Sequence, residues 1–209
     1  ACPGIEVSAW RAHVLLLGDT AAVDRTRYNR DLESLLALLR ESESEYGALT
    51  VASIPEYARN HWQRLDTLVA HGLDGFEVVN ASPKANELTR AARDSVIALA
   101  RRTDRFVLGV SDHHGWGATS MVWNLVPVPG RGAAPERVCA GILARLGEGF
   151  GAVRIVERHR LRPDSPWPHL LTPLGVVWET WRGMGRAAAA AWLLWIWGLW
   201  GGLRLRRRA

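Results

Sequence analysis

The chain has 209 residues, of which 48% are hydrophobic and 22% are charged, a composition that excludes an intrinsically disordered or collagen-like protein. This length is sufficient for one domain with a substantial hydrophobic core. The net charge of +5 lies entirely in residues 166–209, which contain six arginines and one acidic residue, so residues 1–165 are neutral. A neutral body argues against a domain that binds nucleic acid through its surface charge.

The cysteine count and the first residues leave the cellular compartment open. Cys2 and Cys139 are too few for a disulfide framework, and the chain has no Cys-x-x-Cys zinc motif. The sequence enters an apolar strand after a few residues, without a starting methionine or a signal peptide. We therefore expect the natural N-terminus to lie upstream of Ala1.

Short apolar runs alternate with amphipathic stretches through the first 160 residues. Two strands are predicted at 5–8 and 13–17, and the leucine spacing predicts a helix at 31–42. The next segments are predicted in the order strand, helix, strand, helix and strand, at 49–53, 57–71, 75–79, 82–103 and 106–110. This alternation indicates right-handed βαβ units with parallel strands, and ligands of such sheets bind at the carboxyl ends of the strands. A strand, a helix and a last strand are predicted at 121–126, 136–147 and 152–157.

The composition changes after residue 160. Residues 161–186 are predicted to form a proline-punctuated linker and an interfacial segment, and residues 187–209 a transmembrane helix with a basic tail. The run 187–203 is uncharged and contains four tryptophans, and four arginines follow it. A buried hairpin or helix of the body, and a helix lying on the membrane surface, are the alternatives. For a single C-terminal span, these arginines favour a cytoplasmic C-terminus and hence an extracytoplasmic body.

Acidic and histidine side chains gather in two motifs. Asp112 and His114 follow the fifth predicted strand, and two residues that lie two apart in extended backbone share a face, as parts of a metal site would. His113 is expected to point to the other face. Glu6 is a charged residue within an apolar strand, where it needs a partner or a metal, and His13 opens the next apolar run. Surface polar residues and a satisfied core histidine are the alternative interpretations.

Together these motifs resemble those of the PHP (polymerase and histidinol phosphatase) superfamily of metal-dependent phosphoesterases. The resemblance covers residues 3–126 and rests on Gly-Ile-Glu-Val-Ser at 4–8, His-Val-Leu-Leu-Leu-Gly at 13–18, Gly-Phe-Glu-Val at 75–78 and Ser-Asp-His-His-Gly at 111–115. It implies an α/β fold, a PHP-type distorted β/α barrel that occupies residues 1–160 with its N-terminal part missing. It also implies metal-ligand roles for Glu6, His13, Asp112 and His114. It places Glu77 and His113 in the wall of the site.

The implied activity is metal-dependent hydrolysis of a phosphoester by a membrane-anchored enzyme that contacts membrane lipid. Mixed imidazole and carboxylate ligands suit Zn, Mn or Fe as the divalent metal ion. Arg131, in a Pro-Gly-Arg-Gly loop, is the candidate for binding the substrate, with a solvated loop arginine as the alternative.

Two departures from the family pattern bear on catalysis. The opening His-x-His motif of the family would precede residue 1, and Ile54 stands before Pro55 where the family has a metal ligand. An apolar side chain cannot bind a metal, and His61 in the following predicted helix is not expected to replace it. The second hypothesis is therefore a catalytically degenerate PHP-like domain that acts as a membrane-tethered binding or scaffold module.

Overall fold

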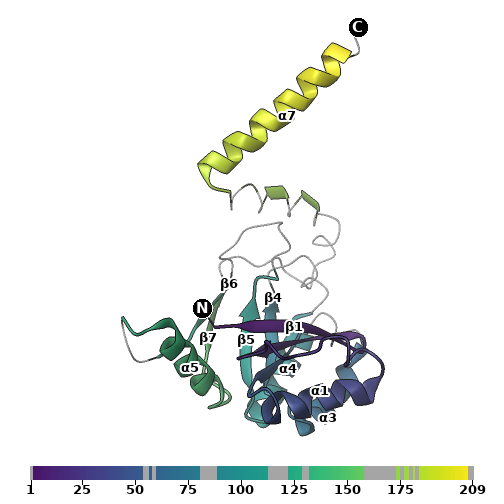
Figure 1. Ribbon diagram of the computed structural model, residues 1–209, viewed down its shortest axis with the longest axis vertical. Coiled ribbons are helices and arrows are strands. Elements are labelled where there is room, and N and C mark those ends of the chain that lie inside the picture. Colours follow the sequence, from purple (N-terminus) through teal and green to yellow (C-terminus); the bar gives the residue numbers. More distant parts are fainter. Residues whose placement is uncertain are drawn as a thin grey trace.

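The computed structural model describes residues 2–53, 57, 60–80, 89–112, 122–128, 132–157, 173–174, 177–178, 181 and 184–206. Its centre is a five-stranded sheet (Figure 1), formed in this order by β1 (Gly4–Ala9), β2 (Ala12–Leu17), β3 (Leu49–Ala52), β4 (Gly75–Asn80) and β5 (Phe106–Val110). β1 and β2 pair antiparallel, as do β2 and β3, whereas β3, β4 and β5 are parallel. The predicted parallel pairing of these last three strands is confirmed, and the sheet as a whole is mixed.

Helices pack against both faces of this sheet. They are α1 (Leu32–Ser44), α3 (Leu65–Ala70), α4 (Arg90–Arg102) and α5 (Pro135–Leu146). The first three contribute buried leucines, a valine and an alanine to the larger core, together with side chains of β1, β2 and β4. On the other face, Leu146 of α5 packs with Phe106 and Leu108 of β5 in a second core. The sheet is therefore the middle layer, and its central strands are buried on both sides as parallel strands require.

The helix starts show which polar residues act as caps. Asp31 accepts a hydrogen bond from the backbone N of Ser34 at 2.8 Å, and Ser34 Oγ accepts one from the backbone N of Asp31 at 3.1 Å. This capping box begins α1 close to its predicted position. Thr89 caps α4, since its Oγ1 accepts from the N of Ala92 at 3.1 Å. The prediction that this helix begins at the Ser-Pro pair of residues 82–83 is therefore wrong.

The helix predicted over residues 57–71 is shorter where the structure describes it. A 3-10 turn, η1 (Trp62–Arg64), precedes α3. Gly72 ends α3 with a φ of 101°, and a Cβ at this position would lie 3.0 Å from the carbonyl oxygen of Leu39. Glycine is needed here for both the left-handed backbone and the close approach of α1, so the predicted terminator is confirmed.

The sheet does not close into the predicted barrel. β1 and β5 are its two edges, and no described strand bridges them. Instead, β6 (Val122–Leu125) and β7 (Arg154–Glu157) form a separate two-stranded sheet. At the β5 edge, the N of Gly109 donates to Asn124 Oδ1 at 2.9 Å, and Asn124 Nδ2 donates to the Gly109 carbonyl at 2.7 Å. The Asn124 side chain therefore occupies the backbone groups of Gly109 that a further strand would bond. The described part of the fold is an open α/β sheet.

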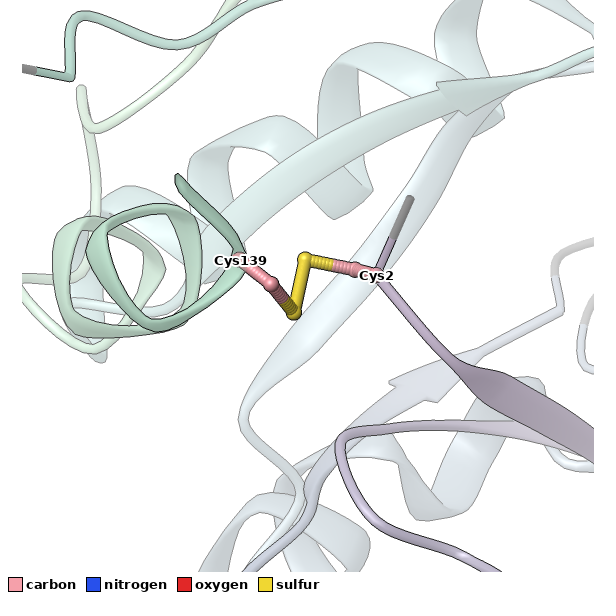
Figure 2. Close-up of a disulfide and its surroundings, with 2 residues drawn as sticks. All are labelled: Cys2 and Cys139. Atoms are coloured by element: carbon pink, nitrogen blue, oxygen red, sulfur yellow. A yellow bond between two sulfur atoms is a disulfide. The ribbon is translucent and has the colours of Figure 1, made fainter. Parts of the chain in front are cut away.

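A disulfide joins Cys2 to Cys139, a bond that the sequence did not predict. Their Cα atoms lie 4.9 Å apart, although the two residues are separated by 137 positions in the sequence. Figure 2 shows Cys2 on the segment that leads into β1 and Cys139 on α5. The bond therefore ties the N-terminal edge strand to the helix that packs against the second face of the sheet.

The C-terminal element is α7 (Arg186–Arg206), which Figure 1 shows extending away from the sheet. None of its residues is buried, and its exposed apolar side chains include Trp192, Trp195, Trp197 and Trp200. The helical conformation predicted for this segment is confirmed. Among the described helices, none is both long enough and apolar enough to cross a membrane. Most of the predicted linker, 161–186, lies outside the described residues.

Candidate functional site

The carboxyl ends of β3, β4 and β5 form one edge of the sheet, because these three strands are parallel. The turn between β1 and β2 lies at the same edge, since the backbone N of Ser53, just after β3, donates to the carbonyl of His13 at 3.2 Å. His13, Glu77 and Asp112 all belong to the strand segments at this edge or directly follow them. Open α/β sheets bind their ligands at this position.

Strand register brings His13 and Glu77 into one row on one face of the sheet. Val51 pairs with Leu15 on one side and with Gly75 on the other, so these three positions share a face. The next positions on that face, toward the carboxyl edge, are His13, Ser53 and Glu77. Because neighbouring strands lie about 4.8 Å apart, the Cα atoms of His13 and Glu77 are separated by roughly 10 Å.

Glu6 and His13 contact each other on this face. Nδ1 of His13 lies 2.7 Å from Oε1 of Glu6, and the two side chains are 37% and 49% exposed, respectively. The carboxylate favours the tautomer that carries its proton on Nδ1 and fixes the plane of the ring, which leaves Nε2 as the acceptor nitrogen. Within the described residues, Nε2 of His13 has no hydrogen-bond partner. A carboxylate that orients an imidazole in this way is the usual outer partner of a metal-binding histidine.

Asn80 links two carboxylates at the ends of β4 and β5. Its Nδ2 donates to Glu77 Oε1 at 2.7 Å and to Asp112 Oδ2 at 3.3 Å. Regular alternation would place Asn80 and Glu77 on opposite faces, but a β-bulge after Glu77 pairs Glu77 with Leu108 and Asn80 with Val110. The bulge therefore returns Asn80 to the face that carries Glu77. Glu77 itself is only 2% exposed.

Asp112 adopts a backbone conformation that few side chains tolerate. Its φ is 43°, in the left-handed region, where aspartate and asparagine are the most common residues besides glycine. Such a conformation costs of the order of 1–3 kcal/mol and persists where surrounding contacts hold it. The hydrogen bond from Asn80 is one of those contacts.

The described site residues thus fall into two groups, Glu6 with His13, and Asp112 with Glu77 through Asn80. The remaining predicted site positions lie outside the described residues: Ile54, His113, His114 and Arg131. Within the part of the chain that the structure describes, no three His, Cys, Asp or Glu side chains stand close enough together to hold a metal ion. Asn80 was absent from the predicted site, because no sequence signal marked the bulge that turns it inward.

Comparison with known proteins supports the fold and leaves the family undecided. No family model matches the chain, and no curated protein matches it. The crystal structure of PsfC from Pseudomonas syringae PB-5123 is similar, with a TM-score of 0.51 and 18% sequence identity. The match covers 85% of this chain and 64% of that one, so the chain spans less than two thirds of that protein. At this identity the likeness concerns the fold alone, and it agrees with a mixed α/β architecture.

Proposed function

We propose that the chain is a metal-dependent phosphoester hydrolase of the PHP type. The observation that carries this proposal is the pair of carboxylates, Glu77 and Asp112, that one amide holds at the carboxyl edge of a parallel strand pair. Carboxylate oxygens gathered at one edge of a sheet are ligands that divalent cations favour. The sequence motifs that contain both residues are those that resemble the PHP superfamily.

The donor chemistry at this edge fits a transition metal. His13 presents an imidazole oriented by Glu6, and Asp112 presents a carboxylate, the two ligand types that Zn, Mn and Fe share. In this proposal His114 completes the set, and Glu6 acts either as a ligand or as the group that orients His13. A bound metal would supply Lewis-acid polarisation of a phosphoryl oxygen and an activated water.

In this proposal the chain's own residues position the metal ligands and orient the substrate. Glu6 favours the neutral tautomer of His13 that carries its proton on Nδ1, which leaves Nε2 as the nitrogen that can bind a metal. Asn80 fixes the Asp112 carboxylate and anchors it to the buried Glu77. Arg131 is the proposed partner of the substrate phosphate.

The first prediction tests metal binding with the full chain and two matched variants. Purified protein reconstituted with Zn, Mn or Fe should retain metal after gel filtration, and Asp112→Ala should lower metal affinity by more than the roughly 10–100-fold typical of losing an outer partner. Asp66→Ala, which removes an exposed carboxylate paired with Arg102 on the surface, should leave metal content unchanged. Elemental analysis measures the occupancy, and release of p-nitrophenol from its phosphate mono- and diester measures hydrolysis.

The alternative function is a degenerate domain of the same type that binds without catalysis. It is favoured by the lack of a three-ligand group within the described residues. Metal binding without hydrolysis of either p-nitrophenyl ester would support it. Equal metal content in the parent, Asp112→Ala and Asp66→Ala would contradict both the hydrolase and the degenerate binding domain, because both proposals assign Asp112 to the metal site.

We also propose that α7 attaches the chain to membrane lipid. Support comes from its exposed apolar side chains and from the arginines at its C-terminal end. Tryptophan and arginine are the side chains that favour the interface between the hydrocarbon and headgroup layers.

A further inference from the structure

The two-residue turn between β1 and β2 holds an arginine in a conformation that favours glycine or asparagine. Arg11 has a φ of 63°, in the left-handed region that tight hairpin turns require. Two side chains from a distant part of the chain hold this turn: Asn60 Nδ2 donates to the Arg11 carbonyl at 2.7 Å, and His61 Nε2 donates to the Trp10 carbonyl at 3.1 Å. A strained residue fixed from outside its own hairpin indicates a functional constraint on its position.

Two guanidinium groups share the indole ring of Trp10. The guanidinium carbons of Arg11 and Arg64 each lie 5.6 Å from the ring centroid, although the two residues are 53 positions apart in the sequence. Both arginines are exposed, and within the described residues neither has a carboxylate partner. By contrast, Arg102 is paired with a carboxylate. Both cations therefore lie at one indole ring, and no acidic group of the described residues pairs with either of them.

The base of this cluster is a buried, neutral histidine. His61 is 1% exposed, and its ring contacts the rings of Trp10 and Tyr57 at centroid distances of 5.2 and 5.6 Å. Burial lowers the pKa of His61, the hydrogen bond to Trp10 opposes this, and the charges of Arg64 and Arg11 lower the pKa further. The imidazole therefore stays uncharged and rigid, and it leaves the positive charge on the two arginines.

The turn lies at the same edge of the sheet as the candidate site, because His13 follows Arg11 by two residues. Trp10 packs against the larger core, whereas His13 and Glu77 lie on the opposite face of the sheet, so a substrate that reaches both would extend around this edge. Resting on the proposed hydrolase function, we propose that Arg11 and Arg64, braced by Trp10, bind a phosphate group of the substrate other than the one that is cleaved. Planar guanidinium groups offer paired N–H donors that match phosphate oxygens. The substrate class is therefore a phosphoester that carries at least two phosphate groups.

The second prediction measures anion binding without metal and without turnover. Calorimetric titration of the full chain with inorganic pyrophosphate in EDTA should show binding that Arg11→Gln and Arg64→Gln each weaken roughly tenfold or more, as expected for a charged hydrogen-bonding partner. Arg30→Gln removes an exposed arginine that also has no carboxylate partner within the described residues, and it should bind like the parent. Unchanged affinity in both Arg11→Gln and Arg64→Gln, or an equal loss of affinity in Arg30→Gln, would overturn the proposal.

Arg11→Gly separates binding from folding. Glycine adopts a φ of 63° without steric cost, so this variant should unfold at a temperature equal to or above that of the parent while it loses pyrophosphate affinity. A folded Arg11→Gly that binds pyrophosphate like the parent would contradict the proposed role. This measurement needs no hydrolysis. A chain that binds pyrophosphate but hydrolyses no phosphoester would therefore support the anion site and refute only the proposed hydrolase function.

Enzyme kinetics show which phosphate the two arginines bind: a second phosphate of the substrate, the phosphate that is cleaved, or free phosphate. With an active metal-loaded protein, Arg64→Gln should raise KM for a nucleoside bisphosphate at unchanged kcat, and it should leave KM for p-nitrophenyl phosphate unchanged. A fall in kcat for both substrates would place Arg64 at the cleaved phosphate and would overturn the proposal. Parental KM for the bisphosphate, with weakened orthophosphate binding, would assign the site to free phosphate and would also overturn it.

Discussion

His61 combines deep burial with a titratable ring, so it couples the stability of the body to pH. Its pKa in the folded protein lies below the ordinary value of about 6.5, chiefly because burial disfavours the charged imidazole. The unfolded chain therefore binds the proton more readily than the folded chain. It follows that the free energy of unfolding decreases as the pH falls below about 6.5 toward the folded pKa.

The third prediction isolates this effect with a non-titrating side chain. His61→Gln keeps an N–H donor for the Trp10 carbonyl, so its free energy of unfolding should fall less than that of the parent between pH 7 and pH 5. Urea denaturation at a series of pH values measures the difference. His71→Gln, at a histidine that is not buried, should follow the parent. Parallel curves for the parent and His61→Gln would show that His61 does not carry the dependence.

Two side chains that the sequence motifs selected meet in the structure, and their metal-binding roles stay predictions. Alternation along β1 and β2, together with the observed pairing of Ser8 with His13, places Glu6 and His13 on one face, and the structure joins them at 2.7 Å. The role of Asn80 was beyond such reasoning, because it depends on a bulge that inserts one residue into the register. The left-handed backbone of Arg11 was equally hidden, since arginine carries no turn signal.

Among the elements, the disulfide is the contact that the sequence could least predict. Cys2 and Cys139 are far apart in the chain, and two cysteines alone do not indicate that they meet. The pairing follows from the fold, because α5 packs on the second face of the sheet, and Figure 2 shows its Cys139 beside the segment that carries Cys2 into β1. The bond restrains an edge strand that would otherwise be held on one side only, by β2.

The fourth prediction is that this disulfide contributes substantially to stability. A bond that closes a loop of more than 100 residues restricts the unfolded chain, and removing a native disulfide typically costs about 2–5 kcal/mol. The variant with Cys2→Ser and Cys139→Ser should therefore unfold at lower denaturant concentration than the oxidised parent. The reduced parent serves as the matched control, because it should unfold like the double variant. Coincident curves for the oxidised and reduced parent would contradict a stabilising role.

At the scale of the whole molecule, the sequence predicted the layered α/β core but not its closure. Helices between β3, β4 and β5 indicated parallel strands, and the structure has them. Barrel closure depends on pairing between residues far apart, which hydrophobic periodicity does not report. Here β1 turns back on β2 as an antiparallel hairpin, and Asn124 covers the backbone of Gly109 at the opposite edge. The described sheet is therefore open, whereas the family resemblance implied a barrel.

The disulfide bears on the compartment in the proposed membrane attachment. A disulfide in the body is typical of an oxidising compartment outside the cytoplasm. The proposal therefore keeps the globular body on the extracytoplasmic side.

The fifth prediction is that α7 binds lipid through two separable contributions. Its exposed tryptophans contribute apolar area, and Arg204, which stacks over Trp200 at 3.9 Å from the ring centroid, places charge at the same end as the following arginines. The full chain should therefore float with vesicles of phosphatidylglycerol and phosphatidylcholine in a density gradient. A variant that ends at residue 185 should remain at the bottom while it keeps the circular dichroism of the folded body.

Charge and apolar variants separate these contributions. Glutamine at Arg204 and Arg206 should weaken binding to the anionic vesicles by about 1 kcal/mol per arginine, with less effect in high salt or on pure phosphatidylcholine. Alanine at the four tryptophans of α7 should weaken binding to both kinds of vesicle, because apolar burial does not depend on lipid charge. Resistance to carbonate washing would indicate a spanning helix, and release by carbonate one that lies at the interface. A full chain that stays with the aqueous fraction in every lipid mixture would refute lipid attachment.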